Sequence, residues 1–131
     1  GVQVAPFYDL LCTAVYHTRL YAADAAIWPD EPLAVPIVGA AVFGDVTREK
    51  LVKTGLALGL APAAATREVT KMIDALPGAA DGLIADMERE FEEIAARAPQ
   101  PDTLRATQGA EAQLLRSIRK IVIADILRQV A

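Results

Sequence analysis

The sequence predicts a single, mainly α-helical domain, and three observations lead to this prediction. The chain has 131 residues, enough for one hydrophobic core and too few for two ordinary domains. Hydrophobic residues make up 53% of it and charged residues 23%, which is typical of chains that fold. From residue 45 onward, apolar residues recur at helical spacing between glycines and prolines. We therefore expect one domain over residues 1–131, with short elements in residues 1–44 and a helical bundle in residues 45–131.

The chain is expected to open with a short strand, a turn and a short helix. Val2–Val4 is extended by composition, and Pro6 disfavours helical backbone at the residue before it. A turn then carries the chain to Asp9, which is suited to cap a short buried helix over residues 10–16. Asp9 therefore stands at a junction between a strand and a helix.

A small β-hairpin is the next expected element. Prolines bracket acidic residues within 24–32, so that segment is predicted to be irregular. Apolar and β-branched residues follow on both sides of Gly39, as Leu33–Ile37 and Ala41–Phe43. Pro36 lacks a backbone donor, so its strand is expected at an edge.

Four helices are predicted after Gly44, each bounded by residues that start or stop helices. They run from Asp45 or Thr47 to about Leu58, from Ala63 to Leu76, from about Ala79 to Ala98, and from Asp102 or Gly109 to Val130. The expected breaks are Gly59 with Pro62, Pro77 with Gly78, and Pro99 with Pro101. The last helix has a broad apolar face, which indicates burial against several neighbours.

Composition excludes several classes of function. The net charge of −4 argues against direct binding of DNA or RNA, which needs clustered Lys and Arg. No apolar run approaches the ~20 residues that a membrane span needs, and no signal peptide is evident, so we expect a cytoplasmic protein. Cys12 is the single cysteine and His17 the single histidine, which excludes an intrachain disulfide and a thiolate zinc cluster. The chain starts with Gly1, and we expect it to be a piece of a longer protein.

Familiar catalytic motifs are missing, and several weaker patterns have ordinary explanations. No phosphate-binding loop, dinucleotide fingerprint, zinc-protease motif or Cys-x-x-Cys pair is present. Gly55 and Gly59 fit a helix end with close packing better than a phosphate cradle. Cys12 and His17 are interpreted as a core thiol and a partly exposed imidazole rather than a catalytic pair.

Two charged groups are interpreted in the same way. An acidic cluster could bind a hard cation, but interleaved arginines favour a solvated helix face with local salt bridges. Its members are Asp86, Glu88, Glu90, Glu92 and Glu93. Basic residues in the last helix favour the helix dipole and a solvated face over a binding patch. They are Arg116, Arg119, Lys120 and Arg128.

Asp9 is the candidate functional residue. A carboxylate that follows an apparent strand, on a turn stiffened by Pro6, is well placed to offer oxygen to Mg²⁺. From physical chemistry alone, a helix N-cap remains the alternative explanation of the same residue.

The order of motifs resembles the C-terminal part of HipA-like serine/threonine kinases, the toxins of type II toxin–antitoxin modules. Val4–Thr13 is similar to the family's A/S/T-P-x-Y-D-[LI]-[LI] motif. Leu33–Gly39 resembles its L-A-x-x-I-G-G element, and Phe43–Glu49 resembles its F-x-D-I-T-R-E helix start. Leu58–Leu60 matches the usual end of that helix. The resemblance covers nearly the whole chain, although specific motifs occur only in the first sixty residues.

The resemblance implies a fold, a metal ligand and partners. The chain would be the helical C-terminal subdomain of a protein-kinase-like fold, and Asp9 would hold Mg²⁺ against the phosphates of ATP. Full-length relatives transfer phosphate from ATP to a protein serine and are neutralised by a HipB-like DNA-binding antitoxin. Their nucleotide-binding lobe and catalytic loop would precede Val2, so this chain alone should hold no catalytic or nucleotide-binding residue and should not catalyse.

Two residues depart from the family pattern. Val38 replaces the first glycine of the Gly-Gly pair, and Pro36 occupies a position that is usually polar. These two residues therefore leave open whether this chain makes the contacts that the family makes at this hairpin.

A non-catalytic binding module is the alternative function. Apolar patches such as Trp28, Phe43 or the last helix would then dock an antitoxin or form a homodimer. An exposed apolar face also predicts self-association of the isolated chain.

Overall fold

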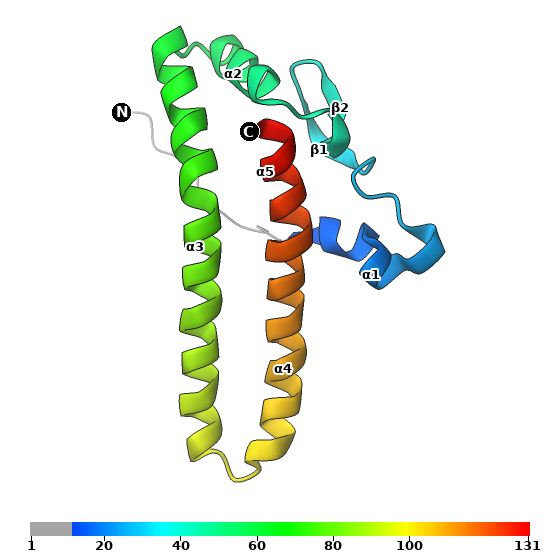
Figure 1. Cartoon of the computed structure of the whole chain (residues 1–131), viewed down its shortest axis with the longest axis vertical. Helices are drawn as coiled ribbons and strands as arrows, with labels where there is room; N and C mark the ends of the chain where they lie inside the picture. Colours follow the sequence, from blue (N-terminus) through cyan, green and yellow to red (C-terminus); the bar gives the residue numbers. More distant parts are fainter. Residues whose placement is uncertain (1–11) are drawn as a thin grey trace.

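The computed structural model describes residues 12–131, and these residues are mainly helical (Figure 1). The longest element, α3 (Pro62–Arg97), runs antiparallel to a helical path made of three consecutive segments. That path consists of α4 (Pro101–Ser117), a π-helical turn (Ile118–Ile123) and α5 (Ala124–Val130). The N-terminal elements pack beside this path and not on the outer side of α3. The two long helical paths thus form the body of the described structure.

Short elements make up the described part of the N-terminal region. They are a 3-10 turn (Thr13–His17), α1 (Arg19–Ala22), a second 3-10 turn (Ala23–Ala25), β1 (Pro32–Ile37), β2 (Ala40–Val42) and a third 3-10 turn (Phe43–Asp45). The predicted strand Val2–Val4 and the start of the predicted first helix lie outside the described residues. Within the described part, the helix expected over residues 10–16 is a single 3-10 turn, and only Ala14 and Val15 of it are buried.

The expected hairpin is confirmed. β1 and β2 pair antiparallel, with Pro32 opposite Val42 and Ile37 opposite Ala40. The turn between them uses Gly39 in the left-handed region, with φ +75°. Val38 adopts an ordinary negative φ and its amide donates to the Thr54 hydroxyl at 3.1 Å. Valine in place of glycine at 38 is therefore compatible with the backbone of this hairpin.

The first helix after the hairpin starts and ends where the local sequence predicts. α2 (Arg48–Ala57) has Thr47 as its N-cap, whose hydroxyl accepts from the Lys50 amide, while Asp45 belongs to the preceding 3-10 turn. Gly59 has φ +88° and ends the helix, as expected of a glycine after a C-cap. On the exposed surface, the Lys53 ammonium 2.7 Å from Glu49 lowers the pKa of that carboxyl.

The two glycines of the Gly55–Gly59 segment have structural roles. A Cβ on Gly55 would lie 3.0 Å from the Cβ of Ala65, so α2 and α3 pack closely at this point. The interpretation as a helix end with close packing is confirmed.

We expect Gly59→Ala to destabilise the protein by about 1–2 kcal/mol, because a left-handed φ strains a residue with a Cβ. Gly109→Ala is the matched variant. Gly109 lies inside α4 and a Cβ there meets nothing within 4 Å, so alanine should stabilise by about 1 kcal/mol. Urea unfolding followed by circular dichroism measures both changes. Equal effects of the two substitutions would contradict this account of Gly59.

The predicted break at Pro77 is wrong, because α3 continues through it without interruption. Proline removes one backbone hydrogen bond and usually kinks a helix. Here half-buried Ile73 and Ile84 lie on both sides of Pro77, and α3 packs along α4 and the π-helical turn. Asp81, one turn beyond Pro77, accepts hydrogen bonds from Nε and Nη2 of Arg119 at 2.8 and 3.0 Å. Before Pro77, α3 packs on α2, where Arg48 donates to the Thr70 hydroxyl, and beyond it α3 packs on the last helix, so contacts on both sides of the proline hold the two halves in line.

The last helix is continuous from Pro101 to Val130, as expected, but contains the π-helical turn. Its apolar face is buried or half-buried, and the core cluster joins Val122 to Ala14 and Val15, with Ile118 and Ile126 packed against it. The expected contact of this face with several neighbours is confirmed. Among residues 12–131, no helix combines the length and apolar character needed to cross a membrane.

Candidate functional site

Asp9, the predicted metal ligand, lies outside the described residues. The structure does describe the segment that begins three residues later in the sequence. Val15 is fully buried and Ala14 nearly so, and both pack against Val122 of the last helix. The last helix therefore holds the 3-10 turn Thr13–His17 in place.

Hydrogen bonds hold the anchored segment in a compact loop. The buried Thr18 hydroxyl donates to the Val15 carbonyl at 2.7 Å, which closes the 3-10 turn. The amides of Ile27 and Trp28 both donate to the His17 carbonyl, at 3.1 and 3.0 Å. Residues 18–28 thus form a loop whose two ends are joined by hydrogen bonds.

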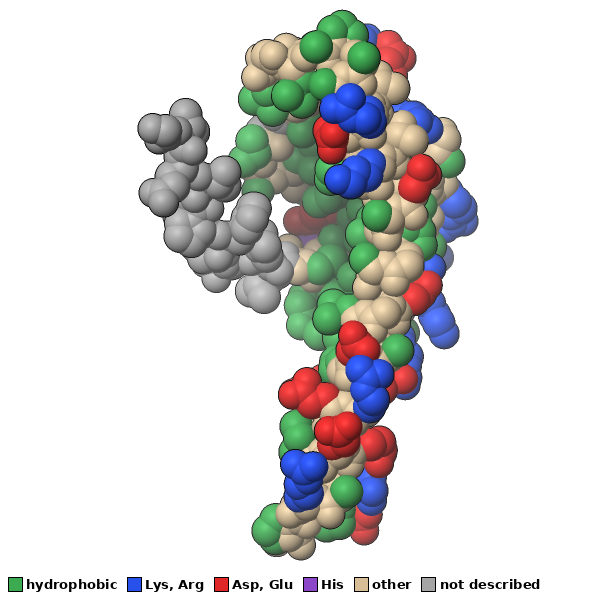
Figure 2. All heavy atoms as spheres, turned by 90° about the vertical axis from the view of Figure 1, so that its left-hand side faces the viewer, with side chains coloured by type: hydrophobic (Ala, Val, Ile, Leu, Met, Phe, Trp, Pro, Cys, Tyr) green, Lys and Arg blue, Asp and Glu red, His purple; other side chains and the backbone are tan. Residues whose placement is uncertain are grey.

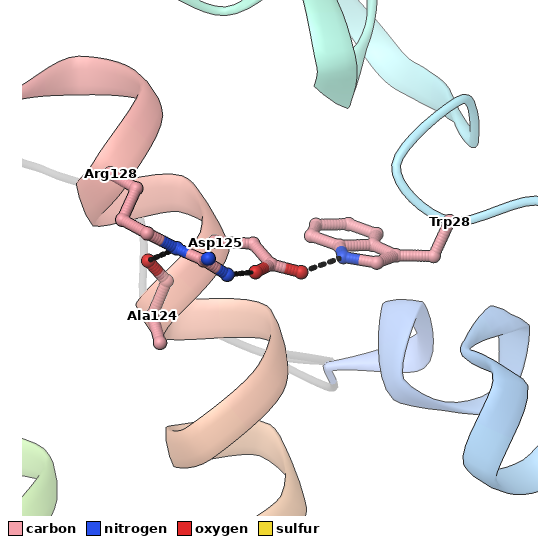
Figure 3. Close-up of polar contacts among 4 residues, drawn as sticks. All are labelled: Trp28, Ala124, Asp125 and Arg128. Carbon is pink, nitrogen blue, oxygen red and sulfur yellow. Dashed lines mark hydrogen bonds and ion pairs between the residues drawn. The ribbon is translucent and has the colours of Figure 1, made fainter.

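A polar contact between distant segments fastens this loop to α5 (Figure 3). The indole nitrogen of Trp28 donates to one carboxylate oxygen of Asp125 at 2.9 Å. Arg128 pairs with the other oxygen and also donates to the Ala124 carbonyl. Asp125 is thus neutralised by an arginine of its own helix and oriented toward the indole.

Trp28 and Phe43 complete this attachment. Their ring centroids lie 5.2 Å apart at an interplanar angle of 46°, and both side chains are half-buried. Gln129 donates from its side-chain nitrogen to the carbonyls of Phe43 and Val46. One face of α5 therefore holds both the loop before the hairpin and the turn before α2. We name the set Trp28, Phe43, Asp125 and Gln129 the α5 clamp.

The structure contradicts the interpretation of Cys12 and confirms that of His17. Cys12 is exposed, so its interpretation as a core thiol is wrong. It precedes a single 3-10 turn that directs only Ala14 and Val15 to the core, which leaves the thiol at the surface. His17 is partly exposed, as expected, and its Nδ1 lies 3.2 Å from a carboxylate oxygen of Glu31.

The acidic cluster is a salt-bridged face, as expected, although two of its ion pairs join different helices. Asp86 pairs with Arg89 on α3 at 2.6 Å. Glu88 pairs with Arg116 and Glu92 with Arg105, both on α4. Within residues 12–131, no three His, Cys, Asp or Glu side chains are grouped so that they could hold a metal ion.

The basic residues of the last helix are only partly a solvated face. Arg116 and Arg119 face α3 and pair with Glu88 and Asp81. Arg128 pairs with Asp125 on its own helix. These interhelical pairs could not be predicted from either helix alone, because the partners are 28 and 38 residues apart.

Comparison with known proteins gives no relative for this chain: no protein-family model, curated protein or solved structure matches it. The geometry of the described residues and the sequence motifs are therefore the basis for any functional assignment.

Proposed function

We propose that this chain is the helical C-terminal part of a HipA-like serine/threonine kinase and that Asp9 is one of its Mg²⁺ ligands. In the whole protein, Mg²⁺ would hold the phosphates of ATP and neutralise charge as the γ-phosphoryl group moves to a protein serine. The phosphate-covering loop, the nucleotide lysine and the catalytic loop would belong to the preceding lobe. A HipB-like antitoxin would be the regulatory partner.

The anchoring of the turn Thr13–His17 on the last helix, four residues beyond Asp9 in the sequence, is the observation that supports this proposal. A metal ligand must be held in place by its surroundings, since a loosely placed carboxylate cannot fix an ion against phosphates. Here Ala14 and Val15 of the 3-10 turn Thr13–His17 pack against the last helix, and the α5 clamp fastens the following loop. A helical base that immobilises one short segment is the role expected of this part of a kinase lobe.

The positions of the other motifs also support the proposal. Leu33–Gly39 forms a strand and its turn, Thr47 caps α2, and Gly59 ends α2. The residues shared with the family pattern therefore occupy positions where the backbone requires a glycine or a cap.

The 131-residue chain is expected to show little or no thermal shift when Mg²⁺ and ATP are added together. Mg²⁺ keeps its waters and normally borrows phosphate oxygens, so a single carboxylate holds it weakly. Differential scanning fluorimetry measures the shift, and the longer protein read from the upstream frame serves as the positive comparison. A saturating shift of several degrees in the 131-residue chain would contradict the proposal that the other metal and nucleotide ligands belong to the preceding lobe.

A docking module without catalysis is the second candidate function, and the exposed apolar residues of α3 favour it. Met72 is 70% exposed and Leu83 is 61% exposed. Trp28 and Phe43, in contrast, pack within the chain. The upstream reading frame separates the two functions. An in-frame Asp followed several residues later by Asn, shortly before Val2, supports the kinase, whereas a start codon there supports the module.

A further inference from the structure

Exposed apolar side chains recur along one line of helix α3, with Glu90 between the last two of them. Met72, Leu83 and Ile94 are 70%, 61% and 45% exposed and follow one another at intervals of eleven residues. Eleven residues make slightly more than three helical turns, so the three side chains lie nearly on one line along about 33 Å of the helix. Leu76, 38% exposed, lies one turn from Met72 on the same face. We name these four residues the α3 stripe.

The last helix does not cover the α3 stripe. Ile73, Ile84 and Ala95 form a neighbouring line, turned by about 100° around the helix, and they are half-buried or fully buried. Hydrophobic and charged side chains both reach the surface on the side of the molecule where α3 faces the viewer (Figure 2). Within residues 12–131, the line of Ile73, Ile84 and Ala95 is thus packed against other elements, whereas the α3 stripe is not. Exposed apolar side chains that recur along one line of a helix are spaced to pack against a second helix.

The stripe is arranged symmetrically about Leu83. Met72 and Ile94 lie eleven residues before and after it. Two copies of α3 that run antiparallel, with Leu83 against Leu83, would therefore place Met72 of each copy against Ile94 of the other. A two-fold symmetric interface requires such self-complementary spacing.

Charges beside the stripe fit the same antiparallel pairing. Glu68 and Lys71 precede the centre, and Glu93 and Arg97 follow it, all on one flank of the stripe. With Leu83 at the centre, Glu68 of one copy faces Arg97 of the other and Lys71 faces Glu93. Among residues 12–131, Glu68 pairs with the adjacent Arg67, and the other three are in no ion pair. In a parallel pairing, each charged residue would instead face the same residue of the other copy, and the like charges would repel.

Small residues at the centre allow two helices to approach closely. Ala79 and Gly82 are exposed on the charged flank of the stripe, and a Cβ on Gly82 would meet nothing within 4 Å. We propose that the chain forms an antiparallel homodimer through the α3 stripe, centred on Leu83. This proposal stands independently of the kinase function, since it uses no residue of the proposed metal site.

Sedimentation equilibrium of the whole chain tests the dimer. The unmodified chain should be dimeric, and Leu83→Glu should raise the dissociation constant about 100-fold or more, because two charges replace two apolar side chains at the centre. Ala85→Glu adds the same charge at an exposed position on the opposite side of α3 and should leave the dimer intact. Circular dichroism verifies that both variants keep their helices. A monomer at every concentration of the unmodified chain overturns the proposal.

Charge exchange tests the antiparallel register with variants at exposed positions that should not disturb folding. Lys71→Glu and Glu93→Lys should each raise the dissociation constant several-fold, because each creates two like-charged pairs in the dimer. The double variant restores opposite charges and should return the constant to near its original value. A double variant that dimerises more weakly than both single variants overturns the register and, with it, the proposal.

Discussion

Asp9→Asn in the longer protein, expressed with its upstream lobe, is expected to abolish phosphoryl transfer while leaving folding nearly intact. Asparagine keeps the shape of aspartate and some of its capping ability, but it lacks the charge that holds the metal. Metal stabilisation of the transferring phosphoryl group is worth several kcal/mol, so activity should fall by at least about 100-fold. Transfer of labelled γ-phosphate to a protein substrate or to the kinase itself measures the loss.

Asp24→Asn is the matched control for Asp9→Asn. Asp24 is an exposed aspartate of the second 3-10 turn, so the substitution removes the same charge from the same region. It should leave transfer unchanged. Full activity of the Asp9→Asn protein would make Asp9 a helix cap and refute the metal assignment. If the unmodified longer protein binds ATP but transfers no phosphate, the docking module becomes the better explanation.

Trp28→Ala is expected to destabilise the chain by about 2–4 kcal/mol. The substitution removes the half-buried ring that packs on Phe43 at 5.2 Å and leaves Asp125 without its indole donor. Because α5 holds the N-terminal loop mainly through this clamp, the loss should also release the loop that follows the 3-10 turn Thr13–His17. Trp28 is the single tryptophan, so urea unfolding must be followed by circular dichroism.

Two further variants separate the ring from the hydrogen bond. Trp28→Phe keeps an aromatic ring but has no N–H group, and it should cost about 1 kcal/mol. Tyr21→Ala removes an exposed aromatic side chain that contacts Tyr16 edge-on, and it should cost less than about 1 kcal/mol. An unfolding midpoint of Trp28→Ala equal to that of Tyr21→Ala would show that the clamp contributes little to stability.

The last helix holds the N-terminal part of the described residues at three points. The turn Thr13–His17 packs on Val122, Trp28 of the next loop donates to Asp125, and Gln129 donates to the turn before α2. On the kinase proposal, the last helix would be needed for activity.

Local chemistry in the sequence determined the mainly helical class and most element boundaries. Thr47 starts α2 and Gly59 ends it, and Pro62 lies in the first turn of α3. A cap, a left-handed glycine and a first-turn proline act within a few residues of the backbone that they fix, so the sequence alone reveals them. Gly39 in the hairpin turn is predictable for the same reason. The assignment of Asp9 depends on the resemblance, because Asp9 lies outside the described residues.

Tertiary structure alone decided the continuity of α3 through Pro77, the exposure of Cys12 and the contact of Trp28 with Asp125. The partners in that contact are 97 residues apart, and no local pattern relates them. Pro77 would break an isolated helix, but packing against α2 before it and against the last helix beyond it offsets the lost hydrogen bond. Burial and long-range pairing depend on which surfaces meet, whereas caps and turns depend only on neighbouring residues. For that reason the sequence predicted most helix ends, with Pro77 as an exception, but not what holds the helices together.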